Sequence, residues 1–226
     1  MNIYFLFEGK RTETKIYPKY LSYLIPELKQ INNYEEIDKN NYYIFSSSGY
    51  PSVYDDIANA IYDINENNNY DYFVICSDAE EMGFEVAKEN IEEILTENKL
   101  KKAIPVIIIQ NVCIETWFLG NRKVFKENPQ NDKLSDYIKF YNIKENDAEN
   151  MGNNGKFNTI AQFHEDYLRL LLNERNMCYS KGKTDDVASK NYFDELVKRT
   201  ETTKHLQSFK VFIDFCLKVK QELQIL

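Results

Sequence analysis

The stretch FLFEGKRTE, residues 5–13, decides how the fold of this chain begins. An apolar run from Ile3 to Phe7 leads into it, and this run has the length and the aromatic and β-branched content of a buried strand. A buried strand does not accept an unpaired carboxylate, because removing the charge from water is costly. Glu8 therefore marks the exit of the strand, and we expect Gly9 to supply backbone freedom for a tight turn.

Behind this turn, the sequence predicts a helix that packs back on the sheet. Thr12 is a residue type that caps helices, and apolar side chains follow it at helical spacing: Ile16, Tyr17, Tyr20, Leu21 and Leu24. In open α/β sheets, the corner between a strand and the following helix is where ligands bind.

The first half of the chain continues this alternation. Three more strands are predicted at 42–46, 72–76 and 103–111, and two more amphipathic helices at 52–64 and from Phe84 onward. Four strands separated by three helices indicate an α/β fold, with a mostly parallel, Rossmann-like four-stranded sheet flanked by helices. Because the run 103–111 is apolar throughout, we expect it to be central or buried on both faces.

The second half of the chain is predicted to be helical. Four segments have helical periodicity: 133–142, 157–174, 188–199 and 205–223. The stretch KENDAENMGNNGK, residues 144–156, has no apolar period and is predicted to be a mobile loop. We therefore divide the chain into an α/β domain, residues 1–120, and a C-terminal helical extension, residues 121–226, that packs on it.

The charge of the chain is unevenly distributed. The formal net charge is −8, which argues against a general nucleic-acid coat protein. Residues 1–112 carry −9 and residues 113–226 carry +1, a division that permits a carboxylate metal site with a separate phosphate-contacting surface. The longest apolar run is too short to cross a membrane and no secretory signal is visible, so we expect a cytoplasmic protein without membrane contact.

Several conspicuous side chains are assigned structural roles. The four cysteines are scattered and the two histidines are far apart, which argues against a structural zinc site. His164 lies on an apolar stripe and is expected to be packed and hydrogen-bonded, and Trp117 is expected to be a core anchor between the two halves. The run SSSG, residues 46–49, is expected to form a turn and helix entry.

Acidic residues follow three of the predicted strands. Because parallel strands end at the same edge of a sheet, we expect one shared neighbourhood for Glu8, Asp78, Glu80 and Glu115. Clustered carboxylates repel one another, and a bound divalent cation relieves that repulsion. Ligands that are all oxygen atoms favour Mg²⁺ or Mn²⁺ over zinc. For each acid taken alone, capping a helix or lying in solvent remains an alternative.

At these residues the sequence resembles a known family. FLFEGKRTE, followed by FVICSDAE at residues 73–80, resembles the TOPRIM domain of topoisomerases, primases and overcoming-lysogenization-defect nucleases. That family has a glutamate and a glycine after its first strand and a pair of acids after its third, which here correspond to Glu8, Asp78 and Glu80. The last of these is a glutamate where the family usually has an aspartate. The resemblance covers about residues 1–120 and implies that these three acids are catalytic and bind metal.

A second resemblance reaches further along the chain. CIETWFLGN at 113–121, YSKGK at 179–183 and HLQSFKVFIDF at 205–215 are similar to small stand-alone bacterial TOPRIM-like proteins, several of them linked to phage defence. The matching positions are Glu115, Trp117, Tyr179, Lys181, Ser208 and Phe209.

Together, the resemblances imply a Mg²⁺- or Mn²⁺-dependent nuclease that acts in bacterial anti-phage defence. Its substrate would be DNA or RNA, and the expected phosphate-contacting residues are Lys10, Arg11, Lys181 and Lys183. An ATPase partner protein and a homo-oligomer are both compatible with this interpretation. The alternatives are a non-catalytic TOPRIM-like sensor or partner-binding subunit of a defence complex and a structural oligomerisation module.

Overall fold

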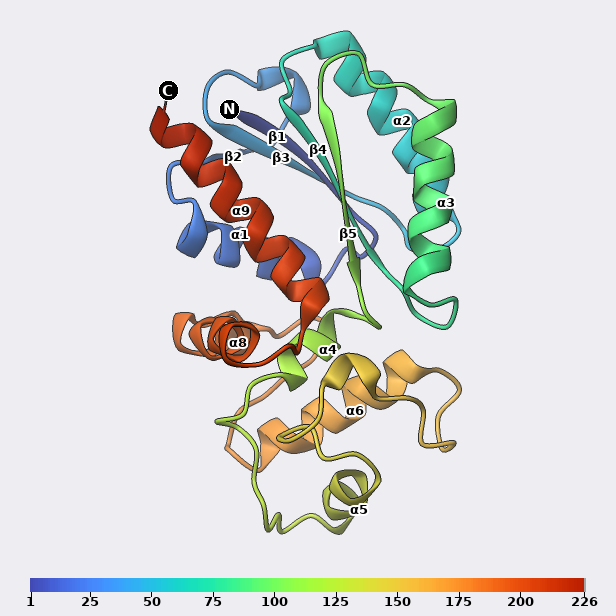
Figure 1. The fold of residues 1–226 in the computed structure, drawn as a ribbon, viewed down its shortest axis with the longest axis vertical. Coiled ribbons are helices and arrows are strands. Elements are labelled where there is room, and N and C mark those ends of the chain that lie inside the picture. Colours follow the sequence, from blue (N-terminus) through green and yellow to red (C-terminus); the bar gives the residue numbers. More distant parts are fainter. Residues whose placement is uncertain (226) are drawn as a thin grey trace.

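The computed structural model describes residues 1–225 and contains one parallel β-sheet (Figure 1). Its strands are β1 (Asn2–Phe7), β2 (Lys29–Ile31), β3 (Asn41–Ser46), β4 (Tyr72–Asp78) and β5 (Ile104–Gln110). They lie in the order β2-β3-β1-β4-β5, and every neighbouring pair is parallel. The predicted α/β class and parallel sheet are confirmed, with five strands in the described residues where the sequence indicated four.

The two edges of the sheet differ from the sequence-based expectation. β2 has three residues, none of them buried, so it lacks the apolar pattern by which a strand is recognised. The expectation of a central strand at 103–111 is wrong, because β5 is the edge strand beside β4. Its first residue, Ile104, is 52% exposed, and Pro105, which cannot donate to a ladder, is tolerated at an edge.

Helices cover both faces of the sheet. Helices α2 (Ser52–Asn67) and α3 (Phe84–Glu97) lie on one face, and α1 (Glu13–Leu24) and α9 (Gln207–Ile225) lie on the other (Figure 1). This double cover explains why all six residues of β1 are buried. The last helix of the chain therefore completes the layer that α1 begins.

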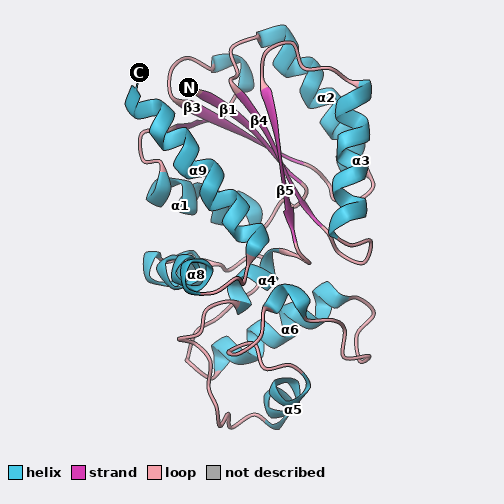
Figure 2. Cartoon of the chain, in the orientation of Figure 1, coloured by secondary structure: helices cyan, strands magenta, loops and turns pink. Residues whose placement is uncertain are grey.

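The remaining helices form a layer beyond one end of the sheet, visible as the lower helices of Figure 2. They are α4 (Ile114–Leu119), α5 (Asp132–Phe140), α6 (Ile160–Asn173), α7 (Asp185–Ala188) and α8 (Lys190–Thr202), with short 3₁₀ turns at Tyr34–Glu36 and Ala148–Asn150. None of the helices between residues 1 and 225 combines the length and apolar character that crossing a bilayer requires.

Trp117 joins the sheet to the C-terminal helices. Its side chain is fully buried, and its ring centroid lies 5.1 Å from that of Phe209 in α9. Its indole nitrogen donates a hydrogen bond to Ser208 Oγ at 2.6 Å. One hydrophobic cluster contains residues of β1, α4, α6 and α9, so the helical part shares a core with the sheet.

The segment 144–156, expected to be a mobile loop, is tied to the start of α9. Glu149 accepts hydrogen bonds from the backbone amides of Gln207 at 2.8 Å and Ser208 at 2.9 Å. The first amides of a helix have no partners within it, and a carboxylate there satisfies them and interacts favourably with the helix dipole. Ala148 and Met151 are buried beside this cap.

His164 is packed and hydrogen-bonded, as the sequence predicts. Its Nδ1 lies 2.7 Å from Thr116 Oγ1 and its Nε2 lies 2.8 Å from the carbonyl oxygen of Met151. Burial lowers the pKa of His164 to about 4, so the ring is neutral, with Nε2 donating to the carbonyl and Nδ1 accepting from the hydroxyl.

Candidate functional site

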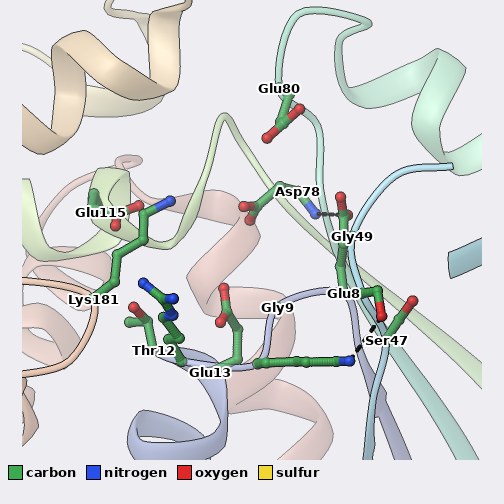
Figure 3. A pocket seen from close by; sticks show the side chains of 13 residues that line it. Glu8, Gly9, Thr12, Glu13, Ser47, Gly49, Asp78, Glu80, Glu115 and Lys181 are labelled. Carbon is green, nitrogen blue, oxygen red and sulfur yellow. Dashed lines mark hydrogen bonds between the residues drawn. The ribbon is translucent and has the colours of Figure 1, made fainter. Parts of the chain in front are cut away.

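A cleft of about 350 Å³ opens at the carboxyl ends of β1, β3 and β4 (Figure 3). The chain leaves β1 for β2 and β3 on one side and passes β4 and β5 on the other, so the cleft lies at a topological switch point. It is lined by Glu8, Gly9, Lys10, Arg11, Thr12, Glu13, Ser47, Ser48, Gly49, Asp78, Glu80, Glu115 and Lys181. The four predicted acids thus line one cleft, together with a fifth carboxylate, Glu13.

Glu8 fastens the ends of two neighbouring strands. Its Oε2 accepts a hydrogen bond from Ser77 Oγ at 2.5 Å and another from the backbone amide of Asp78 at 3.1 Å. Its second oxygen, Oε1, accepts no hydrogen bond from the residues that the structure describes. Glu8 is therefore held in place through one oxygen and can bind a ligand through the other.

Asp78, the last residue of β4, lies at the centre of the cleft. Gln110 satisfies both of its neighbours only with its amide nitrogen toward Asp78, and Nε2 then donates to Asp78 Oδ1 at 2.7 Å while Oε1 accepts from the Tyr17 hydroxyl. Burial raises the pKa of Asp78 well above its ordinary value, and the nearby carboxylates, Glu13 first among them, raise it further. This acid lacks a neutralising cation.

Glu13 is the acid that the sequence analysis missed. It stands in the first turn of α1 and is 8% exposed. Burial raises its pKa from 4.5 to about 7, and the charges of Glu115 and Glu8 add to the effect. The signal was present in the opening stretch, five residues after Glu8, but an acid in a first helical turn is also the ordinary complement of a helix dipole.

Gly9 is needed for the close approach of Glu13. A Cβ atom built on Gly9 would collide with the carboxylate of Glu13. Gly9 is not among the glycines with positive φ, so the expectation that it relieves backbone strain in a tight turn is wrong. The absence of a side chain at this position makes room for a buried acid.

Glu80 lies on the rim of the cleft, on the loop that follows β4 (Figure 3). Its backbone amide donates to the carbonyl oxygen of Val112 at 2.9 Å, and its φ of 41° is a conformation that non-glycine residues seldom adopt. Partial burial raises the pKa of Glu80, and the charge of Glu8 contributes. Its side chain is exposed, so this acid can meet a ligand at the cleft mouth.

Glu115 is held by a residue from the C-terminal half. The carboxylate is 3% exposed in the first turn of α4 and accepts a hydrogen bond from the Tyr179 hydroxyl at 2.6 Å. The same hydroxyl lies 3.4 Å from Thr12 Oγ1 at the start of α1. Tyr179 thus connects the helical extension to two elements of the cleft wall.

Lys181 follows Tyr179 and lines the same cleft (Figure 3). Burial lowers its pKa, but the charges of Glu115, Glu165 and Asp78 outweigh that effect, so the pKa is raised. The ammonium group therefore stays charged beside the carboxylates, where it can contact a phosphate.

The other predicted cations are divided between the cleft and the surface. Lys10 and Arg11 line the cleft, and Lys10 Nζ donates to Ser48 Oγ at 2.8 Å. Lys183 is not part of the lining; its backbone closes a turn with Ser180. Lys15 holds this turn through a hydrogen bond of 2.5 Å to the carbonyl oxygen of Gly182.

The chemistry of the cleft fits Mg²⁺ or Mn²⁺. Its acidic donors are all carboxylate oxygens, the ligands these hard cations prefer. Among residues 1–225, no three Asp, Glu, His or Cys side chains already stand as a ligand set for one ion. The raised pKa values of Glu13 and Asp78 nevertheless identify acids whose mutual repulsion a divalent cation would relieve.

Comparisons with protein-family models, with curated proteins and with solved structures return no significant match for this chain. The assignment of a function therefore rests on the residues of the cleft and on the sequence motifs that place them there.

Proposed function

We propose that this chain is a Mg²⁺- or Mn²⁺-dependent nuclease of TOPRIM type, acting in the cytoplasm as an effector of bacterial anti-phage defence. The observation that carries the proposal is the composition of one cleft at a sheet edge. Its acids are Glu8, Glu13, Asp78, Glu80 and Glu115, and its cations are Lys10, Arg11 and Lys181. The acids supply ligands for a metal ion, and the cations supply contacts for a phosphate.

The residues divide the work of phosphodiester hydrolysis between them. A bound divalent ion would orient the phosphate and stabilise charge on its oxygens. Asp78 and Glu8, fixed by hydrogen bonds at adjacent strand ends, would hold that ion. Glu13, with a pKa of about 7, can accept a proton from the attacking water near neutral pH. Lys181 would balance negative charge as the P–O bond breaks.

The second sequence resemblance adds support. Two pairs among its six positions are hydrogen-bonded to each other, Tyr179 to Glu115 and Trp117 to Ser208, both at 2.6 Å. The first pair shapes the cleft wall, and the second lies in the core next to Phe209. Positions far apart in sequence thus serve one site and its support.

A non-catalytic sensor or partner-binding subunit is the second candidate function. It is favoured by the lack of a ready ligand set of three side chains within residues 1–225 and by the engagement of Glu8 Oε2 with Ser77 and Asp78. In that case the cleft would bind a cation or a partner without cleaving anything. Both functions suit a two-component system with an ATPase partner.

Cleavage assays separate the two functions. Plasmid DNA, linear DNA and RNA are incubated with the protein in Mg²⁺, in Mn²⁺ and in EDTA. The nuclease proposal predicts metal-dependent cleavage that Asp78→Asn abolishes and that Asp136→Asn, a matched change at an exposed carboxylate of α5, leaves intact. Undiminished cleavage by the Asp78→Asn protein would remove Asp78 from the mechanism, and metal binding without any cleavage would favour the sensor.

A further inference from the structure

A second hollow, of about 450 Å³, is lined mainly by cations. Its charged lining residues are Arg122, Lys126, Lys144 and Arg175, with Glu127 as the only acid among them. They come from the loop after α4, the loop after α5 and the end of α6. On a chain with a net charge of −8, this is a local concentration of positive charge.

Two of these cations lack an acidic partner in the part of the chain that the structure describes. Arg175 Nε donates to the carbonyl oxygen of Val124 at 3.1 Å, and its Nη2 donates to that of Phe125. These bonds fix the guanidinium without neutralising it. Arg122 makes no side-chain hydrogen bond or ion pair within residues 1–225.

The other two cations of the hollow are paired. Lys126 contacts Glu174 at 2.6 Å, and Lys144 contacts Glu127. Both glutamates would compete with an incoming anion for these lysines, so Arg122 and Arg175 are the groups most available to a ligand.

Neighbouring cations feel the excess charge. Burial, followed by the charge of Arg122, lowers the pKa of Arg199 to about 10. The pKa of His205 is lowered by burial and by the charges of Arg199 and Arg122. A bound anion would relieve this repulsion between like charges.

The acid cleft creates a need for such a surface. Its five carboxylates and three cations leave two negative charges in excess when all are ionised, so one divalent ion only balances the cleft. A nucleic acid carries one negative charge per nucleotide, and binding it requires cations elsewhere on the protein.

Helix α4 links the two sites along the chain. Glu115 lies in its first turn and Arg122 follows its end at Leu119 (Figure 1). With four helical steps and three extended ones, their Cα atoms are at most about 17 Å apart, which is about five nucleotide steps of one strand.

We propose that this cationic hollow binds the phosphodiester backbone of a nucleic acid and anchors the strand that is cleaved at the acid cleft. The anchoring role rests on the proposed nuclease function, whereas binding of the backbone does not.

The test measures binding in EDTA, where metal-dependent cleavage is absent. Fluorescence anisotropy follows a fluorescein-labelled oligonucleotide, supplied as single-stranded RNA and as duplex DNA, across about 50 to 200 mM salt. The variant is Arg122→Gln combined with Lys144→Gln, and the control is Lys88→Gln on α3, outside the hollow. Circular dichroism checks that each protein is folded.

The proposal predicts about tenfold weaker binding by the double variant and a shallower dependence on salt, by about 1.4 to 1.8 in the log–log slope. Lys88→Gln should bind like the wild type. Binding of the folded double variant within twofold of wild type, or no binding by the wild type, overturns the inference. Cleavage by a wild type whose hollow variant binds normally would leave the nuclease proposal standing, whereas hollow-dependent binding without cleavage would refute the nuclease and the anchoring role and leave the backbone-binding site standing.

Discussion

Replacing Glu13 by glutamine is predicted to stabilise the metal-free protein at alkaline pH. The pKa of Glu13 is about 7 in the folded protein, against an ordinary value of 4.5. Because the folded state holds this proton more tightly than the unfolded chain does, ionising Glu13 opposes folding. The wild type should therefore lose stability as the pH rises from about 4.5 to about 7, and lose no more above that from this group.

The size of the effect follows from the two pKa values. At about 1.36 kcal/mol per pKa unit, the shift corresponds to about 3 kcal/mol of unfolding free energy. Glutamine keeps the shape of the side chain but never ionises, so the variant should gain this amount at pH 9 and nothing at pH 4. For a chain of this length, the gain corresponds to a melting temperature about 6 to 12 °C higher.

Urea denaturation in EDTA at a series of pH values measures this gain. Glu89→Gln is the matched control, because Glu89 is an exposed residue of α3 outside the cleft. Saturating Mg²⁺ should reduce the advantage of Glu13→Gln, since the ion stabilises the ionised carboxylates of the wild type. A gain that is equal at every pH, or no gain at pH 9, would refute the argument that unrelieved charge repulsion is stored at Glu13.

Three further substitutions test the support of the cleft. Tyr179→Phe removes the donor to buried Glu115 and should cost about 1.5–3 kcal/mol in urea denaturation, with a smaller loss in a Glu115→Gln background; equal losses in both backgrounds would show that the two side chains are not coupled. Gly9→Ala should weaken Mn²⁺ binding more than folding because its Cβ displaces the Glu13 carboxylate, and calorimetry should show the same Mn²⁺ affinity for Glu13→Ala with or without it. Ser208→Ala leaves the buried Trp117 indole N–H without its acceptor and should lower the unfolding free energy by about 1–3 kcal/mol; an unchanged urea midpoint would contradict that role.

The parts of the fold that local pattern governs could be predicted from the sequence. The strand that ends at Glu8, the acids after β4 and the helix entry at Glu115 are short-range features, and parallel topology then brings them to one edge. The parallel sheet itself follows from the alternation of strands and helices.

Features that depend on distant contacts could not be predicted in this way. β5 is apolar yet lies at an edge, because α9 and α3, which are distant from it in the sequence or on opposite faces, supply its cover. The segment 144–156 is polar, but Glu149 caps a helix that begins at Gln207. The cationic hollow likewise combines residues that are separated by more than fifty positions.

The acid cleft itself was only partly predictable for the same reason. Glu13 resembles an ordinary first-turn acid until the fold places it beside Glu115. Lys183 and Lys181 are two residues apart in one loop, yet only Lys181 lines the cleft, because the turn that Lys183 closes with Ser180 is a three-dimensional feature.

Calorimetric titration of the metal-free protein with Mn²⁺ tests the central claim, a divalent-cation site at the acid cleft, most directly. At pH 6.5, where Glu13 with its pKa of about 7 is largely protonated, binding should be saturable and should release protons. That release appears as a difference in the observed heat between two buffers of unlike ionisation enthalpy. The account predicts this proton-linked binding in the wild type, with much weaker binding in Asp78→Asn; absence of any Mn²⁺ binding by the wild type, or equal binding by the two proteins, would contradict it.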